Sequence, residues 1–403
     1  MKVLHVIPSL SKLKGGPTPI TLNMVEALRK QGVDATILST DDDDNGRLDV
    51  EINKWTTYEG LPVYFLSRFL FPIKDFIYCP GMKQWLANHL KEYDLIHTHY
   101  LFSYAPNVAA RMAKKAGIPY IMTPYGMLAP WAISHQHHKK LFFNFHQKKL
   151  LKNAQGIHCS TITEIKNVQD YGVHENLFIN PYIVKSNALI PDAKIELRKL
   201  YSITDSEVII LYLARLHQMK QPELLIQAIH RLKKEGLSVH LLMAGNGTDS
   251  YENYLKEKAT SLKDQGAFTF AGFVSGRQKE ILYQGSDIYV LPSHSENFGM
   301  TVCEASVSQT PVIITPGVQI ADEMEKSGSG LIAENTVESI IQKIRMLIND
   351  SHLRKTMGEN GRKWVLDAYN PEKVAGDLKQ EYQRIINNFN IQYISILFFS
   401  TIL

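Results

Sequence analysis

The sequence predicts an α/β protein made of two doubly wound domains, and three observations support this. The chain has 403 residues, which is too long for one ordinary hydrophobic core. Short apolar runs alternate with helical patterns, as in a parallel sheet covered on both faces. Near residues 182–205 Pro191 and polar or charged residues replace this alternation. We therefore expect a first domain at 1–185 and a second at 186–370.

In the first half, compact apolar runs indicate strands, and helical patterns or turns separate them. The expected strands are Val3–Ile7, Ala35–Ser39, Val63–Leu66, Asp94–Thr98, Pro119–Thr123 and Gly156–Cys159. The expected helices are a stretch from Ile20 to Leu28 that ends at Gly32, Met82–Leu90, Tyr104–Ala116, residues 136–152 and a segment that starts at the capping box Thr161–Glu164.

The second half repeats this plan and ends in long helices. Its expected strands are Val208–Ala214, Val239–Ala244, Phe268–Phe270, Ile288–Leu291 and Val312–Ile314. Its expected helices are Pro222–Lys234, Tyr251–Leu262, Gly276–Tyr283, Met300–Ser308 and long helical stretches from Val337 to about Asn388. We expect residues 371–403 to form a helix that packs back on the first domain and ends in an apolar tail. Because open sheets of this kind bind ligands at the carboxyl ends of their strands, a cleft between two facing domains is the expected site.

Composition points to a globular protein of a reducing compartment. Hydrophobic residues make up 44% of the chain and charged residues 21%. The three cysteines stand far apart, so neither a zinc site nor a disulfide framework is indicated, and we predict a cytoplasmic protein. No apolar run reaches the 18 residues of a membrane span. The apolar tail at 391–403 leaves three readings open: a packed element, an interfacial anchor or a frayed end.

The basic residues are concentrated in one acid-free segment. A net charge of +4 does not suggest nucleic acid binding, but no acidic residue occurs between Asp94 and Glu164. The basic residues of this segment are Arg111, Lys114, Lys115, Lys139, Lys140, Lys148, Lys149 and Lys152. Such a segment attracts phosphate-rich partners such as lipid headgroups, lipid diphosphates or nucleotides. In residues 135–152 the lysines alternate with aromatic and aliphatic residues, which suits docking on an anionic membrane surface; alternatively, the apolar face packs in the core.

No metal site is expected. Asp41–Asp44 is a run of four carboxylates, and consecutive loop residues rarely converge on one ion, so we expect a solvated, mobile loop. The sequence contains no zinc-protease, calcium-loop or phosphate-loop ATPase motif.

The most informative segment runs from Ser293 to Glu304. It follows the strand Ile288–Leu291, and it carries two carboxylates, Glu296 before the predicted helix and Glu304 inside it. The free N–H groups of Gly299 and Met300 at the helix start could hold an anion. Carboxylates suit sugars because each accepts two hydroxyl hydrogen bonds. The alternative is a helix cap and a solvated helix residue.

Two cations follow the first strand of the second half. Arg215 and Lys220 lie just after Val208–Ala214, at the strand end where a diphosphate would bind. Either could instead be an ordinary surface cation. The turn with Gly245 and Gly247 is a further loop that permits close approach, and by itself it is weak evidence.

Residues 211–323 resemble the C-terminal domain of the family 4 retaining glycosyltransferases, which have the two-domain GT-B fold. The motifs that carry the resemblance are Ala214-Arg-Leu-His-Gln-Met-Lys220, Leu242-Met-Ala-Gly-Asn-Gly247, Ala271-Gly-Phe-Val274, Ser295-Glu-Asn-Phe-Gly299 with Glu304, and Thr310-Pro-Val-Ile-Ile-Thr315. The first half resembles the family more loosely, through Gly15-Gly16, Asp94–His99 and Thr123–Trp131. The resemblance implies two Rossmann-like domains that face a central cleft.

The resemblance also implies roles for individual residues. Arg215 and Lys220 would bind the donor diphosphate, Glu304 the ribose hydroxyls and Glu296 hydroxyls of the transferred sugar. The remaining implied donor-binding residues are Gly16, Phe273 and Val274 near the base, Asn297, Phe298, Gly299 and Met300. It further implies retention of the anomeric configuration, with no metal and no cofactor.

One position departs from the family pattern. Many members carry a histidine just before the glycine that is Gly126 here, and this sequence has Tyr125. His99 ends an expected strand, so we expect it to face the cleft as a substitute; alternatively it is an ordinary buried histidine. The candidate catalytic residues are thus Glu296, Arg215, Lys220 and His99, with Tyr125 and His99 on the acceptor side.

The function expected from the resemblance is transfer of a hexose from a nucleotide diphosphate sugar to an acceptor hydroxyl. A lipid-linked glycan of surface polysaccharide synthesis, met at the inner face of the membrane, is the expected acceptor. Two alternatives stay open: a sugar-nucleotide 2-epimerase of the same fold, and a binding subunit without turnover. The sequence leaves open the sugar, the base and the linkage.

Overall fold

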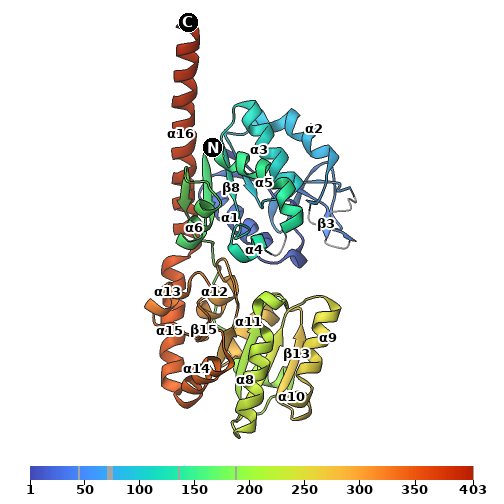
Figure 1. Ribbon diagram of the computed structural model, residues 1–403, viewed down its shortest axis with the longest axis vertical. Coiled ribbons are helices and arrows are strands. Elements are labelled where there is room, and N and C mark those ends of the chain that lie inside the picture. Colours follow the sequence, from blue (N-terminus) through green and yellow to red (C-terminus); the bar gives the residue numbers. More distant parts are fainter. Residues whose placement is uncertain (44–45, 70–75, 135–136, 187, 403) are drawn as a thin grey trace. The chain divides into compact units, whose positions relative to one another are not determined.

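A computed structural model describes the chain except residues 44–45, 70–75, 135–136, 187 and 403, and it describes no side chains for 137–143 and 392–402. The chain divides into two compact units (Figure 1). The first consists of Met1–Ile183 and Pro371–Leu403, and the second of Val184–Asn370. The first unit is therefore discontinuous, because the C-terminal helix belongs to it; the sequence placed the boundary two residues later, at 185.

The first unit is built on one eight-stranded sheet. The strand order is β10-β9-β8-β7-β1-β2-β6-β5, parallel except for the β5–β6 pair. The strands are β1 (Lys2–Val6), β2 (Asp34–Thr40), β5 (Trp55–Tyr58), β6 (Leu61–Leu66), β7 (Leu95–His99), β8 (Tyr120–Thr123), β9 (Gly156–Cys159) and β10 (Leu177–Ile179). A separate short hairpin pairs β3 (Asp42–Asp43) with β4 (Gly46–Arg47). The two strands at the sheet ends, β5 and β10, were not expected from the sequence.

Helices cover both faces of this sheet. They are η1 (Lys12–Lys14), α1 (Pro17–Lys30), α2 (Pro80–His89), η3 (Leu90–Glu92), α3 (Tyr104–Ala116), α4 (Pro130–Ser134), α5 (His137–Lys152), α6 (Ile162–Asp170) and α16 (Pro371–Ile402). The main apolar core joins one face to α2, α3 and α5 through residues such as Trp85, Ala109 and Leu151. On the other face α16 packs beside α1.

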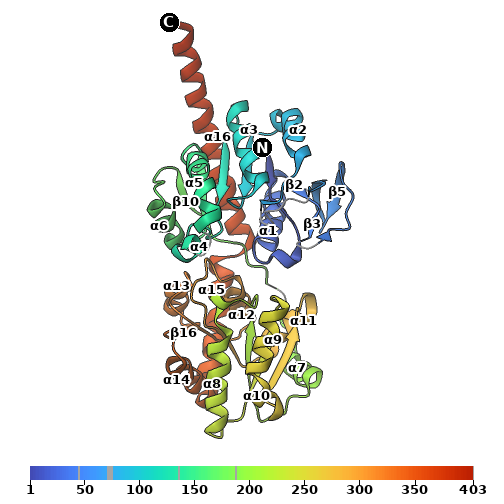
Figure 2. The same ribbon diagram turned by 45° about the vertical axis from the view of Figure 1, so that its right-hand side comes forward.

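The long helix α16 crosses the sheet from its carboxyl edge to its amino edge. The Asn180 amide, just after β10, donates to the Val374 carbonyl (3.2 Å). Ile385, three turns further on, lies so close to Gly156 at the start of β9 that a Cβ there would be 2.8 Å from its Cδ1. Beyond Ile385 the helix continues past the sheet, and its final turns extend beyond the other elements of the unit (Figures 1 and 2). No helix among the described residues is long and apolar enough to span a bilayer.

The second unit has a six-stranded, fully parallel sheet of order β13-β12-β11-β14-β15-β16. Its strands are β11 (Val208–Leu213), β12 (Val239–Ala244), β13 (Phe268–Gly272), β14 (Ile288–Leu291), β15 (Val312–Ile314) and β16 (Gly330–Ile332). Its helices are α7 (Ala193–Tyr201), η4 (Gln218–Lys220), α8 (Pro222–Lys234), α9 (Asp249–Lys258), α10 (Thr260–Asp264), α11 (Gly276–Gly285), α12 (Met300–Val307), α13 (Ala321–Lys326), α14 (Val337–Asn349) and α15 (Ser351–Ala368).

One predicted helix divides into two, and the helical stretches expected after Val337 form three helices. Residues 251–262 span α9 and the start of α10, and the stretch from Val337 is divided between α14, α15 and α16. The first break in that stretch lies at Asp350, whose side chain accepts a hydrogen bond from the Leu353 N–H and caps α15. The second lies before Pro371, which begins α16 and cannot continue a preceding helix.

The prediction of a solvated loop at Asp41–Asp44 is wrong for its first two residues. Asp41 and Asp42 are buried, and Asp44 lies outside the described residues. The Arg47 guanidinium donates to an Asp41 oxygen (2.7 Å), and the Arg68 guanidinium pairs with Asp42. Because buried carboxylates need cationic partners, these arginines explain why the two aspartates can fold inward.

Candidate active site

The two predicted donor carboxylates both lie beyond the carboxyl end of β14. Glu296 sits in the loop before α12, where its N–H donates to the Gly317 carbonyl (2.9 Å) and its carbonyl accepts from the Gln319 N–H (3.1 Å). Glu304 lies in the second turn of α12. Their side chains are 22% and 25% exposed, so both carboxylates are held by the fold yet remain open to a ligand.

Gly299 supplies the backbone conformation that starts α12. Its φ is +80°, and a Cβ there would meet Val318 Cγ1 at 3.0 Å, so a larger residue would be strained and crowded. No side chain caps the helix start. The first N–H groups of α12 are therefore in the right place to bind an anion.

Lys220 and Glu296, which are far apart in the sequence, form an ion pair. Lys220 lies in η4 and is buried, with only 7% of its surface exposed. The two loops are joined through Met219, whose carbonyl accepts hydrogen bonds from the His294 N–H (2.8 Å) and the Ser293 hydroxyl (3.2 Å). The fold thus brings together the predicted diphosphate cation and the predicted sugar carboxylate.

Arg215 follows β11 at the same sheet edge and is exposed. No ion pair to its guanidinium is found in the part of the chain that the structure describes. Its charge is accordingly available for a phosphate.

Glu304 is held by two side chains of α11 that the sequence analysis missed. Lys279 Nζ contacts Glu304 Oε1 (2.6 Å), and the Tyr283 hydroxyl donates to Oε2 (2.9 Å). Burial, followed by the charge of Glu304, raises the pKa of Tyr283 well above its ordinary value, so the phenol remains a donor. Lys279 and Tyr283 are one helical turn apart, which puts them on one face of α11. Each Glu304 oxygen keeps a lone pair for a ligand hydroxyl.

The other predicted donor residues are placed in different ways. Phe273 and Val274 follow β13 at its carboxyl end; the Phe273 ring is 51% exposed, whereas Val274 is buried. Phe298 is buried and packs edge-on against Tyr369, so only its backbone can face a ligand. Asn297 and Met300 are partly exposed.

The glycine turn after β12 has a packing explanation. A Cβ at Gly245 would be 1.9 Å from the Ala214 carbonyl oxygen, and one at Gly247 would be 2.6 Å from that of Leu216. The glycines allow two neighbouring loops to touch, and this turn needs no ligand to account for it.

In the first unit, Gly16 is exposed at the start of α1, where Pro17 follows it and no side chain caps the helix. This is the position that the resemblance gives to a glycine near the diphosphate.

Tyr125 stands at the carboxyl end of β8 in an unusual backbone conformation. Its φ is +53°, which is rare for an aromatic residue and is a mark of functional sites. Its hydroxyl lies 3.1 Å from Thr21 Oγ1 and 2.9 Å from His99 Nδ1. The phenol thus points into the unit, and the turn and the ring are what Tyr125 can present to an acceptor.

His99 is completely buried, which departs from the expectation that it faces a cleft. Its Nε2 lies 2.9 Å from His5 Nδ1, and its Nδ1 is engaged by Tyr125. Burial and the neighbouring histidines lower its pKa well below the ordinary value, so the ring is neutral. In this structure His99 can act on a substrate only through Tyr125, as a positioning residue.

The histidine network extends across the sheet. His97 lies 2.5 Å from the Tyr382 hydroxyl of α16 and 2.7 Å from Thr123 Oγ1. Burial is the main cause that lowers the pKa of His5 to about 3 and that of His158 to about 4. Nitrogens of His5, His97 and His99 lie within 4.8 Å of one another, a grouping that could ligate a metal. Because the rings already bond to each other and to hydroxyls, we interpret the group as a neutral hydrogen-bonded network.

Glu164 fixes the turn that carries Tyr125. The Thr161 hydroxyl caps α6 by accepting from the Glu164 N–H (3.0 Å), as the capping box predicted. The Glu164 carboxylate accepts from the N–H groups of Gly126 (2.6 Å) and Ser160 (2.7 Å). A buried carboxylate therefore holds the Tyr125–Gly126 turn in place.

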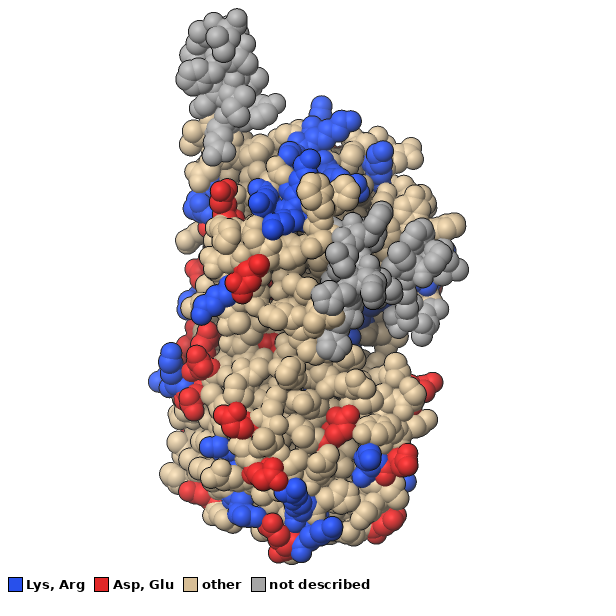
Figure 3. All heavy atoms as spheres, viewed as in Figure 1, with Lys and Arg blue, Asp and Glu red and all other residues tan. Residues whose placement is uncertain are grey.

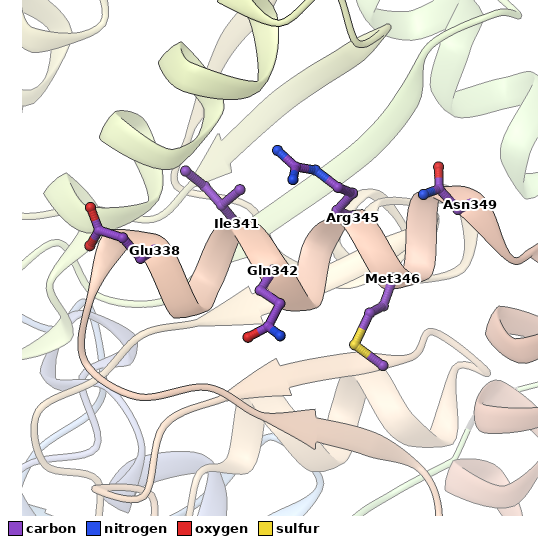
Figure 4. A pocket seen from close by; sticks show the side chains of 6 residues that line it. All are labelled: Glu338, Ile341, Gln342, Arg345, Met346 and Asn349. Atoms are coloured by element: carbon purple, nitrogen blue, oxygen red, sulfur yellow. The ribbon is translucent and has the colours of Figure 1, made fainter.

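A surface hollow of about 260 Å³ lies elsewhere in the second unit. Figure 4 shows that all its labelled lining residues project from α14. Two of them pair with α8 and its end: Glu338 with Arg231 (2.5 Å), and Arg345 with Glu235. None of the predicted site residues lines the hollow, and we assign it no role.

Two parallel-sheet units, with carboxylates, cations and an uncapped helix at the carboxyl edge of the second sheet, define the class of the GT-B glycosyltransferases. Residues 193–364 match the family model of the glycosyl transferases group 1. Residues 15–182 match the glycosyl transferase 4-like domain. The predicted resemblance to family 4 is thereby confirmed.

Individual relatives share less than 30% sequence identity with this chain. The alpha-monoglucosyldiacylglycerol synthase of Streptococcus pneumoniae is 27% identical over 71% of this chain and 64% of its own length. An uncharacterized glycosyltransferase of Methanocaldococcus jannaschii is 29% identical over 51% of this chain and 52% of its own length. The matches thus span between half and two thirds of these relatives.

Solved structures confirm the predicted fold class. Sucrose-phosphate synthase from Thermosynechococcus elongatus superimposes with a TM-score of 0.77 at 18% identity, covering 96% of this chain and 100% of that one. The Anabaena HepE protein in complex with UDP-glucose gives a TM-score of 0.76 at 17% identity, covering 95% and 100%.

Proposed function

We propose that this protein transfers a hexose from a nucleoside diphosphate sugar to an acceptor hydroxyl, with retention of configuration and without a metal ion. The observation that supports this proposal most directly is the grouping of Glu296, Glu304, Lys220 and Arg215 beyond the carboxyl ends of β11 and β14. Family membership supports the reaction class, and the complex of HepE with UDP-glucose supports the kind of donor.

The donor would be recognised in three parts. Arg215, Lys220 and the uncapped start of α12 suit the diphosphate, because all three present positive charge or N–H groups. Glu304, held by α11, suits the ribose hydroxyls, and Glu296 suits hydroxyls of the transferred sugar. The exposed ring of Phe273 can contact the base.

The chemistry would be mainly electrostatic. As the diphosphate departs it gains negative charge, which Arg215, Lys220 and the α12 start stabilise. We favour attack by the acceptor hydroxyl on the face from which the diphosphate leaves, with the hydroxyl proton passing to a donor phosphate oxygen. The glycosidic bond to the phosphate breaks as the bond to the acceptor oxygen forms. A trapped glycosyl adduct on Glu296, detected by mass spectrometry, would contradict this route.

We further propose a lipid-linked glycan of surface polysaccharide synthesis as the acceptor, met at the inner face of the membrane. Two observations support it. One is the similarity to the alpha-monoglucosyldiacylglycerol synthase of Streptococcus pneumoniae, and the other is the basic, aromatic composition of residues 135–152. Side chains 135–143 of that segment lie outside the described residues. Tyr125 and its turn would take part on the acceptor side.

The first experiment is a thermal-shift screen with UDP, GDP, ADP and dTDP on the wild type and on Glu304→Ala. A ligand at 100 times its Kd adds about 2.7 kcal/mol of stability. One nucleotide should stabilise the wild type and not the variant. Nucleoside diphosphate should then be released from the matching donor only when acceptor is added. Release at the same rate without acceptor, or no stabilisation by any nucleotide, would contradict the proposal.

A further inference from the structure

The first unit has one edge at which basic side chains and an apolar helix end come together. This is the amino edge of its sheet, where the strands begin. It lies opposite the carboxyl edge that carries Tyr125. Because α3 and α5 run antiparallel to the strands they precede, their C-terminal ends both lie at the amino edge, next to the starts of β8 and β9.

The ends of these two helices carry five basic residues, which we call the basic patch: Arg111, Lys114, Lys115, Lys149 and Lys152. All five are exposed. Lys114 bonds to the Asn153 side chain (2.5 Å), which ties the two helix ends together. Figure 3 shows Lys and Arg side chains gathered at this end of the unit.

The basic patch has no carboxylate partners within the described parts of the chain. Its acid-free sequence, from 95 to 163, explains this. Glu92, on η3 beside α3, is already bonded to Lys2 (3.2 Å) and His89 (2.7 Å). The positive charge of the patch is therefore uncompensated, and it suits a surface that carries many negative charges.

The helix α16 leaves the unit at this same edge. After Arg384 the sequence contains no charged residue, and residues 391–402 consist mostly of isoleucine, phenylalanine and other apolar residues. Ile391, the last residue whose side chain is described, is 63% exposed. In both ribbon views the backbone of the final turns extends away from the sheet of the first unit (Figures 1 and 2). As a helix these twelve residues span about 18 Å, which is roughly the depth of one leaflet of a bilayer.

We propose that the amino edge of the first unit is a docking surface for an anionic lipid bilayer, with residues 391–402 of α16 inserted in one leaflet and the basic patch on the headgroups. An apolar helix needs a medium without water, and the charges beside it select a negatively charged one. Neither signal is strong alone, but two together give stable anchoring. This inference refines the membrane docking in the proposed function: the described lysines at the end of α5 act with α3 and α16.

Docking at this edge has a consequence for the proposed acceptor. The carboxyl edge with Tyr125 would be held away from the headgroups by the height of the sheet. An acceptor on a long polar carrier, such as a glycan already extended from its lipid, would reach it more easily than a hydroxyl at the membrane surface.

Flotation of the full chain with phosphatidylcholine vesicles, with and without about one third phosphatidylglycerol, tests the proposal. The wild type should float with the anionic vesicles, less so in 1 M salt and weakly with the neutral ones. A variant with Phe398→Asp and Phe399→Asp should no longer float. A variant with Lys115→Gln, Lys149→Gln and Lys152→Gln should bind roughly 100-fold more weakly to anionic vesicles. The matched control removes three exposed lysines of the second unit, with Lys199→Gln, Lys234→Gln and Lys263→Gln, and should float as the wild type does.

Stabilisation by the donor nucleotide is measured on every variant, and it should be unchanged because the donor site lies in the second unit. If the wild type fails to float while nucleotide still stabilises it, the docking surface is overturned and the proposed sugar transfer stands. Equal binding by the patch variant and its control would overturn the role of the patch. A concentration-dependent dimer in sedimentation, abolished by Phe398→Asp and Phe399→Asp and without vesicle binding, would assign the helix end to a second copy of this chain instead.

Discussion

The two units treat their polar side chains in opposite ways. In the second unit, charged groups from separate loops pair at a sheet edge and stay partly exposed, as Lys220 with Glu296 and Lys279 with Glu304 do. In the first unit, neutral imidazoles and hydroxyls form a network that water does not reach, with His5, His97 and His99 fully buried. In the proposed function the charged pairs of the second unit exchange their internal partners for a ligand, whereas the buried network of the first unit keeps its partners.

The largest expected effect concerns the charged pairs of the second unit. Lys220→Ala should lower kcat by about 10²–10³-fold, since removing one preorganised donor to a developing anion typically has this effect. Steady-state rates with the identified donor measure it. Folding should persist, because Glu296 keeps access to water at 22% exposure. If kcat stays within twofold while KM alone rises, Lys220 serves ground-state binding only.

The second-largest effect is expected in the first unit, whose buried histidine network should lose stability on acidification. Burial holds the pKa of His5 at about 3 and that of His158 at about 4, whereas an unfolded histidine titrates near 6.5. The unfolded chain then binds more protons below pH 6.5, so stability is complete above that pH and is lost as the pH falls toward 4. Each such histidine lowers the free energy of unfolding by about 2 kcal/mol between pH 6.5 and 5.

Urea unfolding at pH 7.5, 6.5, 5.5 and 5.0 measures this loss of stability, with a separate spectroscopic probe that reports on each unit. The first unit should lose stability ahead of the second. A second unit that unfolds first on acidification would contradict the assignment of the loss to the histidine network.

Tyr125→Phe should have a smaller, structural effect. It removes the hydroxyl that bonds Thr21 and His99, and leaves a buried ring nitrogen without its partner, at a cost of about 1–3 kcal/mol. Thermal unfolding measures the loss, and nucleotide binding to the second unit should not change. Tyr125→His is the informative companion, because it restores the residue type that many family members carry there. An unchanged melting temperature in Tyr125→Phe would mean that the network closes without the phenol.

Lys279→Met should have the smallest effect, roughly two- to fivefold on nucleotide affinity, because the Lys279–Glu304 pair is partly exposed. In the proposed site Lys279 orients Glu304 toward the ribose, so the loss should be greater for a ribonucleoside diphosphate than for its 2′-deoxy analogue. Arg277→Met is the matched control on α11, since Arg277 pairs with Glu196 (2.8 Å) and not with Glu304. Tighter binding by Lys279→Met would show that the lysine competes with the ligand.

Much of the fold was predictable because strand and helix signals are local. The strands from β1 to β15 that the apolar runs predicted are present, and so is the α6 capping box. The edge strand β5 was not predicted because Trp55–Tyr58 is short and half exposed, so it lacks the compact apolar run of the other strands. The placement of Glu296 and Glu304 beyond β14 was predictable because both stand in one motif, and their binding roles stay predictions.

What escaped prediction depends on distant partners. Lys279 and Glu304 are 25 positions apart, and the burial of Asp42 depends on Arg68, 26 positions away. His99 looked available because it ends a strand, and it is buried because Tyr125 and His5 enclose its ring nitrogens. Such pairings are set by how elements pack, which no local pattern contains.

The discontinuity of the first unit bears on how the chain is made. His97 and the Tyr382 that bonds it are separated by 285 positions, and the whole second unit lies between them. During synthesis the eight strands of the first unit emerge well before α16, so the buried imidazoles must wait for their last partner until the second unit has been translated. The second unit can fold as a continuous segment, while the first remains open on one face until α16 has been translated. Of the two units, the first therefore begins to form first and is completed last. A ribosome that stalls between residues 184 and 370 would leave the polar side chains inside the first unit without the α16 residues that cover them.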